Sequence, residues 1–307
     1  MSSDKITIAY RLEDALVAGL IALFKALGPT RASRFGGWLA GTLGPLIPTS
    51  KVADRNLRLA MPELTAAQRQ AIVRQCWASF GATAGELAHL GRIGAISPQT
   101  PGPGYILEGW DEHIAPSFAK GGPGIFITAH LGNWEVLPSA AHAHGMELAF
   151  MYRAASNPLV NARLLRLRAE ATGRPPVMFP KGAAGARAAY GWLLKGGQLG
   201  LLVDQKLDTG LSVPFFGHNA MTMDAMAAFA LKFRCPVYPV RTLREGPARI
   251  RIICAPPLVL PDTGGKEGDM YALTLAMNQL IEAWVRETPG QWLWLHRRWP
   301  KAATRDL

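Results

Sequence analysis

Cysteine is scarce in this sequence and is not arranged for cross-linking. The 307 residues include three cysteines, Cys76, Cys235 and Cys254, at long spacings and without a CxxC pair. This odd number and wide separation argue against a disulfide scaffold and against a zinc ribbon. They indicate a reducing compartment.

Several motifs that carry enzyme chemistry are absent as well. The sequence has no GxGxxG or P-loop motif, which disfavours a nucleotide-binding enzyme. It has no GxSxG elbow for a nucleophilic serine and no HExxH pair for zinc. Lysine and arginine form no basic block, and no zinc-finger, homeodomain or RNA-recognition signature occurs, so nucleic acid is not an expected partner.

The overall charge nevertheless indicates an anionic partner. The formal net charge is +11 and the isoelectric point about 9.9, an excess that attracts anionic lipid headgroups or an acidic ligand. A hydrophobic share of 49% and a charged share of 18% exclude wholesale disorder. The mean hydropathy of +0.09 is high for a cytosolic enzyme but low for a multi-span membrane protein. These totals favour a globular protein that touches a membrane.

No uninterrupted run of about 20 apolar residues, the length that spans a bilayer, is present. The apolar stretch 15–24 follows Glu13 and Asp14, is ended by Lys25 and precedes no small-residue cleavage site, so it does not have the pattern of a clean signal peptide. With its flanks, the stretch 10–27 is just long enough to span, because a lysine near one end can snorkel. An amphipathic core helix is the alternative.

We expect residues 1–50 to anchor the protein to a membrane, either by spanning it or by lying in its interface. A second apolar patch, residues 36–48, belongs to the same region. Cations follow, which places the bulk of the chain on the cytoplasmic side: Arg31, Arg34, Lys51, Arg55 and Arg58.

The chain up to about Arg92 has helical periodicity. Apolar residues recur at helical spacing over residues 65–90, and Thr65 is placed to cap the start of that helix. The Pro/Gly-rich stretch 97–104 then marks a boundary. The predicted organisation is a membrane-associating helical segment (1–50), a helical subdomain (51–100) and an α/β domain (101–307).

Beyond this boundary, short apolar runs alternate with amphipathic stretches. Strands are predicted at residues 124–130, 147–153, 175–180, 199–205, 235–241 and 248–256, and helices at residues 161–173, 182–197 and 269–287. This alternation predicts an α/β fold, in which helices flank a mainly parallel central sheet, preceded by the N-terminal helical region.

Polar side chains end most of the predicted strands. In open α/β sheets, ligands gather at the carboxyl ends of the strands. The residues at these positions include a base, three cations, a carboxylate and an amide: His130, Arg153, Lys181, Asp204, Gln205 and Arg241. Their recurrence predicts a substrate site at that edge of the sheet.

His130 and Glu135 stand out among the polar residues near strand ends. Five residues apart on an ideal helix, they would not share a face, so they can meet only if the chain bends at Gly132 between a strand and a helix. A carboxylate in that position could orient the imidazole as a general base. A buried histidine that caps a helix is one alternative, and a zinc site completed by His142 and His144 is another.

The hexapeptide HLGNWE, residues 130–135, resembles the His-X4-acid motif of the acyltransferases of phospholipid and lipid A synthesis. Glutamate in the acidic position is similar to the lipid A (lauroyl/myristoyl) branch of the wider lysophospholipid/glycerol-phosphate acyltransferase superfamily. Further blocks that resemble the family are RNLRLAMPEL (55–64), MYRAASNPLVN (151–161), VDQKLDTGLSVPFFG (203–217) and QWLWLHRRW (291–299). The resemblance therefore covers nearly the whole chain.

This resemblance implies transfer of a fatty acyl chain from acyl carrier protein to a hydroxyl of an anionic lipid A precursor. The reaction would take place at the cytoplasmic face of the bacterial inner membrane, without metal or cofactor. His130 would deprotonate the hydroxyl and Glu135 would orient His130.

The resemblance also assigns residues to the substrate side of the site. Arg153 matches an arginine near the phosphate of the acceptor, and Asp204 and Gln205 match an Asp-Gln pair. Lys181 stands where the glycerol-phosphate branch has glutamate, and we infer that it could bind phosphate.

Other functions are open on the sequence alone. The same chemistry could act on another glycolipid or on an ornithine-type lipid. A non-catalytic lipid-binding protein or a metal-dependent hydrolase could share the pattern. A binding protein has no need of both His130 and Glu135, which argues against it. The tryptophans Trp292, Trp294 and Trp299 suit either a membrane interface or interior packing.

Overall fold

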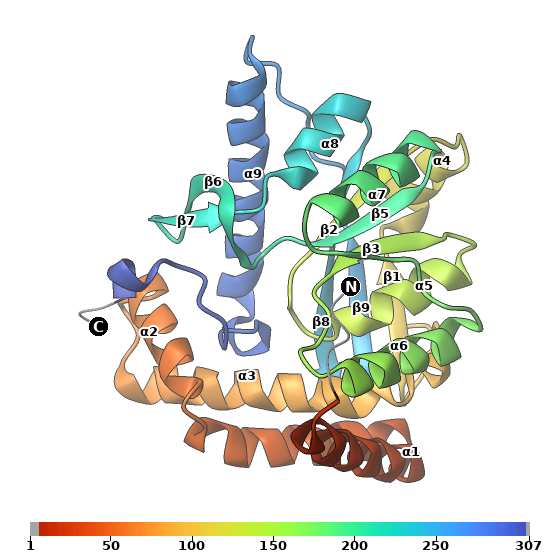
Figure 1. Cartoon of the computed structure of the whole chain (residues 1–307), viewed down its shortest axis with the longest axis vertical. Helices are drawn as coiled ribbons and strands as arrows, with labels where there is room; N and C mark the ends of the chain where they lie inside the picture. Colours follow the sequence, from red (N-terminus) through yellow and green to blue (C-terminus); the bar gives the residue numbers. More distant parts are fainter. Residues whose placement is uncertain (1–5, 305–307) are drawn as a thin grey trace.

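The computed structural model describes residues 6–304, and its N-terminal part is helical. Helix α1 (Ile8–Leu43) runs along the base of the molecule in Figure 1, followed by α2 (Ser50–Ala60) and by α3 (Ala66–Leu87), which lies against α1. The predicted cap of α3 is confirmed. Thr65 Oγ1 accepts from the Gln68 N–H, and the Gln68 side chain accepts from the Thr65 N–H.

A kink divides α1 at Gly28 and Pro29. Gly28 has a φ of +74°, and Pro29 has no backbone N–H to donate to the preceding turn. The buried imidazole of His89 lies with Nε2 2.7 Å from the carbonyl oxygen of Phe24. His89 thus holds the kinked turn of α1 against the chain that follows α3.

Small residues allow α1 and α3 to approach closely. A Cβ on Gly36 would lie 2.2 Å from the Gly81 carbonyl oxygen, and one on Gly85 would lie 2.4 Å from the Ala32 carbonyl oxygen. The backbones therefore touch where these glycines cross, and no larger side chain fits. No helix among residues 6–304 has the length and hydropathy needed to cross a membrane, which corrects the expectation that residues 10–27 could do so.

A seven-stranded sheet forms the centre of the molecule, in the order β1-β9-β8-β2-β5-β3-β4. Every neighbouring pair is parallel except β8 and β9, which are antiparallel. The predicted α/β fold with a mainly parallel sheet is confirmed. The strands are β1 (Gly104–Glu108), β2 (Gly124–Thr128), β3 (Leu148–Tyr152), β4 (Met178–Pro180), β5 (Gln198–Leu202), β8 (Val237–Gly246) and β9 (Arg249–Cys254).

Two features of the strand pattern are not predicted by the sequence. Strand β1 begins at the last glycine of the stretch that marks the boundary, and it is short. Strands β6 (Lys206–Phe215) and β7 (His218–Thr222) form a separate antiparallel hairpin. Gly210 and Pro214 lie inside β6 and interrupt the alternation of apolar and polar residues by which a strand is identified in a sequence.

Helices cover both faces of the sheet. One face packs on α7 (Ala183–Leu194), α8 (Ala225–Phe233) and α9 (Lys266–Glu287). The other packs on α5 (Leu137–Ala143) and on the π-helical turn η3 (Trp110–Ile114), which leads into α4 (Ala115–Phe118). Helix α6 (Pro158–Thr172) contacts both α1 and α5, at the edge of the sheet.

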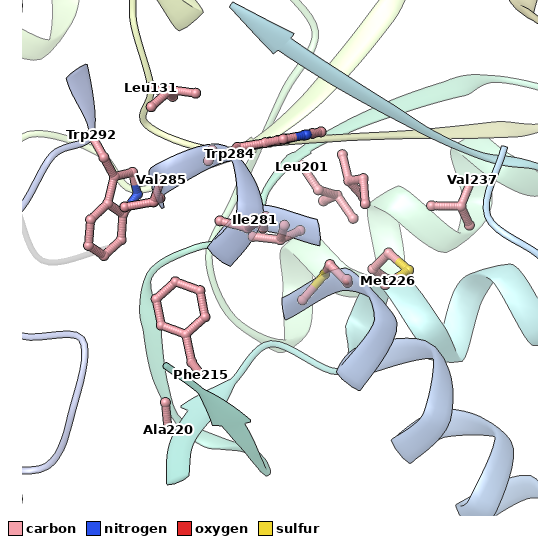
Figure 2. Close-up of a cluster of buried hydrophobic side chains, with 14 of the residues drawn as sticks. Leu131, Leu201, Phe215, Ala220, Met226, Val237, Ile281, Trp284, Val285 and Trp292 are labelled. Carbon is pink, nitrogen blue, oxygen red and sulfur yellow. The ribbon is translucent and has the colours of Figure 1, made fainter. Parts of the chain in front are cut away.

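The larger of two hydrophobic clusters lies on the α9 side of the sheet. Figure 2 shows Leu201 and Val237 of the sheet with Met226 of α8 and Ile281 of α9, and all four are buried. The three cysteines are buried free thiols, and burial raises the pKa of Cys76 to about 12.

The C-terminal tryptophans belong to the interior. Trp292, Trp294 and Trp299 are each at most 1% exposed, so their role is packing rather than contact with a membrane interface. Arg298 beside them is also fully buried, donates to Thr222 Oγ1 at 2.7 Å and lies over the Phe215 ring. These contacts fix the end of the described chain onto the β6–β7 hairpin.

Candidate active site

His130 stands two residues beyond the end of β2, where the chain turns sharply. Gly132 makes the turn with a φ of +56°, and a Cβ there would lie 2.5 Å from the Thr242 carbonyl oxygen. Only glycine fits this position without a shift of the backbone. The turn leaves His130 at the carboxyl edge of the sheet, where the sequence predicts a site.

His130 is held by Asp204, which follows β5. The imidazole Nδ1 lies 2.8 Å from Oδ1 of Asp204, and the His130 backbone N–H donates to Oδ2 at 2.9 Å. Trp292 donates its indole N–H to the same Oδ2 at 2.7 Å. One carboxylate thus fixes both the ring and the backbone of His130.

Asp204 is ionised in the folded protein. Burial alone would raise the pKa of this carboxyl, but the charge and hydrogen bonds of His130 outweigh burial and hold that pKa well below its usual range. Because an ionised carboxylate only accepts hydrogen bonds, Nδ1 of His130 carries a proton, and in the neutral imidazole Nε2 is then the nitrogen with the lone pair. This is the tautomer that a general base requires.

The Nε2 side of His130 faces a partly open space. Gln205 Nε2 lies 3.4 Å from His130 Nε2, and the Trp134 ring packs against the imidazole with centroids 5.0 Å apart. The His130 side chain is 14% exposed, whereas that of Asp204 is fully buried. A hydroxyl group can therefore approach Nε2 while the carboxylate stays dry.

Glu135 is paired with Arg168 of α6 rather than with His130. It lies in the 3₁₀ turn η4 (Trp134–Val136), which begins where Asn133 Oδ1 accepts from the Glu135 N–H. Arg168 donates two hydrogen bonds to the Glu135 carboxylate, at 2.8 and 2.7 Å. Burial alone would lower the pKa of Arg168, but the charge of Glu135 raises it. The contact expected between Glu135 and His130 is made by Asp204 instead, because the turn directs Glu135 towards α6.

Arg153 and Lys181 follow neighbouring strands at the same edge. Tyr152 of β3 pairs with Pro180 of β4, and the Lys181 N–H donates to the Tyr152 carbonyl. Both cationic side chains are exposed. Since β2, β5, β3 and β4 run parallel, these cations lie on the edge that carries His130 and Asp204.

Arg241 does not end a strand, so that prediction is wrong. Strand β8 continues to Gly246 because it pairs with β9 over its second half. The Arg241 guanidinium forms an ion pair with Glu287 of α9 and lies over the Trp284 ring. Arg241 therefore belongs to the α9 side of the sheet.

His142 and His144 lie at the end of α5. His144 Nδ1 is 3.0 Å from the Ala140 carbonyl oxygen, and its ring packs on Trp110. Among residues 6–304, no three His, Cys, Asp or Glu side chains are grouped so that they could hold a metal ion.

A narrow apolar cavity lies between the sheet and α5, and it reaches Thr128, two residues before His130. Its walls come from β2, β5 and β8 on one side and from α5 and η3 on the other. The Phe150 ring packs directly on Gly200 of β5, where a Cβ would lie 2.5 Å from that ring. The cavity has a volume of about 40 Å³, which is too small for a whole fatty acyl chain without movement of its walls.

The site therefore combines a tautomerically fixed histidine, an apolar cavity and exposed cations. The sequence matches the family of bacterial lipid A biosynthesis acyltransferases over residues 3–301. The chain belongs to this family. A search of curated proteins gave no match. Membership in the lipid A acyltransferase family implies an acyltransferase, in agreement with the resemblance of HLGNWE and the blocks around it.

Two residues of this acyltransferase site are not assigned by sequence reasoning. Arg168 lies in the predicted basic helix, but its partner Glu135 is 33 residues away. Trp292 lies in the QWLWLHRRW block. Nothing in the sequence of that block indicates that this tryptophan, rather than its neighbours, contacts the site. Asp204 is predicted as a substrate ligand, whereas the structure places it against His130.

Proposed function

We propose that this acyltransferase moves a fatty acyl chain from the thioester of acyl carrier protein to a hydroxyl of a lipid A precursor, with His130 as the general base. The observation that carries the proposal is the hydrogen bond between His130 Nδ1 and Asp204, which makes Nε2 the acceptor nitrogen of the neutral ring, with Gln205 Nε2 3.4 Å away. Family membership supports the reaction class and the lipid A pathway.

The proposed reaction begins at the acceptor hydroxyl. His130 Nε2 takes the hydroxyl proton while the oxygen attacks the thioester carbonyl, and Asp204 stabilises the imidazolium. The carbon–sulfur bond then breaks, and the imidazolium returns the proton to the leaving thiolate. The products are an ester on the acceptor and the free thiol of the carrier.

The cavity beside Thr128 is the proposed point of entry for the acyl chain, and its walls must part to take the chain in, because its volume is about 40 Å³. Its lining is almost wholly apolar, so burial of each methylene there is favourable by about 0.8 kcal/mol. A chain that enters from the carboxyl edge of the sheet would hold its carbonyl group near His130. Substrate binding of this kind places the reacting atoms together before the chemical step.

The cations at the sheet edge are the proposed contacts for the anionic acceptor. Arg153 and Lys181 are exposed and neighbouring, and Gln205 can reach the hydroxyl end through Nε2. Glu135 is proposed to act through Arg168, because their two hydrogen bonds fix α6 beside the site. Arg241 is not included, since its charge is paired with Glu287.

Helix α1 supports attachment to a membrane surface. Ile8, Leu12 and Leu16 recur every four residues and are 78%, 67% and 67% exposed, and Leu23 continues the same stripe. A helix with such a stripe lies in the plane of the interface. We propose that α1 attaches the protein there in place of a membrane span.

A cationic groove between α2 and α3 is a second surface that suits a membrane. Residues 43, 46 and 47, just before α2, are exposed and apolar. The groove is lined by Lys51, Asp54, Arg55, Arg58, Arg69 and Arg74. Anionic headgroups at the cytoplasmic side of the membrane suit this excess of positive charge.

The proposal is tested by an acyl-transfer assay with purified protein, acyl carrier protein thioesters and a panel of acceptors. The expected result is a mass increase of one acyl group on the lipid A precursor. Transfer to another glycolipid or to an ornithine-type lipid, with none to the precursor, would redirect the proposal to that acceptor. Release of free fatty acid as the sole product would contradict acyl transfer.

A further inference from the structure

The C-terminal segment 291–294 is part of the His130 site. It forms an antiparallel bridge between Leu131 and Trp292. The Leu293 N–H donates to the His130 carbonyl at 3.0 Å, and the Gly132 N–H donates to the Gln291 carbonyl at 3.1 Å. The backbone on either side of the Gly132 turn is therefore fixed by residues about 160 positions later in the chain.

Trp292 adds a side-chain contact to these backbone bonds. Its indole N–H donates to Asp204 Oδ2 at 2.7 Å, the oxygen that also accepts from the His130 backbone, while Oδ1 remains for the imidazole. Trp292 is fully buried and packs on Phe215 with centroids 5.8 Å apart. Figure 2 shows Trp292 beside Val285 and close to Leu131.

We propose that Trp292 is a positioning residue of the acyl-transfer site, which orients the Asp204 carboxylate and thereby His130. This inference rests on the proposed role of His130 as general base. With the indole in place, the carboxylate plane is fixed by three donors, and one oxygen points at Nδ1. Without the indole, Oδ2 keeps one donor in a site closed to water, so the carboxylate can rotate away from the imidazole.

The structure offers a matched control for this role. Trp294 is as deeply buried as Trp292, and the two rings contact each other edge to face with centroids 4.6 Å apart. The Trp294 indole, however, donates to the Pro289 carbonyl and not to the site. Replacing either tryptophan by phenylalanine removes a buried indole N–H and similar volume, but only Trp292→Phe removes a donor to Asp204.

The first test compares Trp292→Phe with Trp294→Phe in acyl transfer and in thermal unfolding. We expect kcat/KM to fall roughly ten- to hundredfold in Trp292→Phe, through kcat, which corresponds to the loss of one hydrogen bond to a charged group. Trp294→Phe should lose stability to a similar extent but keep its kcat. Equal kcat in the two variants would overturn the positioning role.

The pH dependence of kcat/KM gives a second readout, which a loss of packing alone would not change. Once its carboxylate can rotate away, Asp204 stabilises the imidazolium less, so the acid limb of the kcat/KM profile should move to lower pH in Trp292→Phe alone. The other charged groups that act on this carboxylate and histidine are His296 and Arg298, and both are unchanged in the two variants. An unmoved limb in Trp292→Phe would count against the proposal.

A second measurement needs no substrate and therefore separates this inference from the proposed function. In protein labelled with ¹⁵N-tryptophan, Asp204→Asn should shift the indole N–H resonance of Trp292 by the loss of a charged acceptor, and should leave that of Trp294 nearly in place. Each indole resonance is assigned by its disappearance from the spectrum of Trp292→Phe or of Trp294→Phe. If both resonances stay unchanged, the Trp292–Asp204 contact is absent; if transfer fails but the Trp292 resonance shifts, only the proposed function fails.

Discussion

His130 Nδ1 lies 2.8 Å from Asp204 Oδ1, although 74 positions separate the two residues. The sheet register brings them together. Thr128 at the end of β2 pairs with Leu202 at the end of β5, and each functional residue stands two positions beyond its strand. Parallel neighbours end at the same edge, so equal offsets place the imidazole and the carboxylate side by side.

Asp204→Asn should lower kcat/KM for acyl transfer by about three to four orders of magnitude. The amide cannot stabilise the imidazolium, and it can hold Nδ1 in the wrong tautomer. Asp208→Asn is the control, because Asp208 is largely exposed and pairs with Lys206 nearby. An Asp204→Asn enzyme as active as the Asp208→Asn enzyme would contradict the role given to Asp204.

Stability should fall between about pH 6.5 and pH 4 because of His296. Burial lowers the pKa of His296 to about 4, so below its ordinary pKa of about 6.5 the unfolded chain binds a proton that the folded protein refuses. Each pH unit in that window then costs up to about 1.4 kcal/mol of unfolding free energy. Urea unfolding at pH 7 and pH 5 measures the loss, and His296→Gln should reduce it. An equal loss of unfolding free energy between pH 7 and pH 5 in the parent protein and in His296→Gln would show that His296 is not its cause.

Gly81→Ala should destabilise the protein by about 1–3 kcal/mol. A Cβ there would lie 2.2 Å from the Gly36 carbonyl oxygen, so α1 and α3 must separate. Gly19→Ala on α1 is the matched substitution, since nothing lies within 4 Å of its Cβ position. It should be neutral or stabilising by about 0.5–1 kcal/mol, as for a glycine in a helix. Thermal unfolding of both variants measures the two effects. A Gly81→Ala protein as stable as the parent protein would contradict the close crossing of α1 and α3.

The double variant Leu12→Lys/Leu16→Lys should weaken binding to vesicles of phosphatidylethanolamine and phosphatidylglycerol by at least about a hundredfold, because two leucines no longer enter the interface. Leu194→Lys on α7 is the control. Leu194 is 68% exposed, as the two α1 leucines are at 67%, but it lies far along the chain from α1. Vesicle sedimentation measures binding, and equal affinity of the two variants would place the attachment elsewhere.

Local patterns predict much of this fold from the sequence. The capping box at Thr65 and the helix that ends before Gly173 depend on nearby residues alone. Strand β1 is not predicted because its five residues follow a Pro/Gly-rich stretch and depend on pairing with β9, about 145 residues later. Strand β8 extends past Arg241 for the same reason, since its second half exists through β9.

The site is predicted in part for similar reasons. His130 and Asp204 are both identified, because each follows an apolar strand. Their pairing requires the sheet order, in which β5 and not β3 lies next to β2, and the sequence patterns do not specify that order. Glu135 is the nearer carboxylate in sequence, but the 3₁₀ turn directs it to Arg168, a contact that depends on where α6 lies.

The central claim is that His130 Nε2 takes the proton of the acceptor hydroxyl. Its most direct test is single-turnover acyl transfer by His130→Gln, which keeps a polar side chain of similar size but cannot act as a base at neutral pH. With saturating acyl carrier protein thioester and lipid A precursor, the rate should fall by about three orders of magnitude or more, while thermal unfolding and vesicle binding stay near those of the parent protein. Transfer by His130→Gln at a rate close to that of the parent protein would contradict the account.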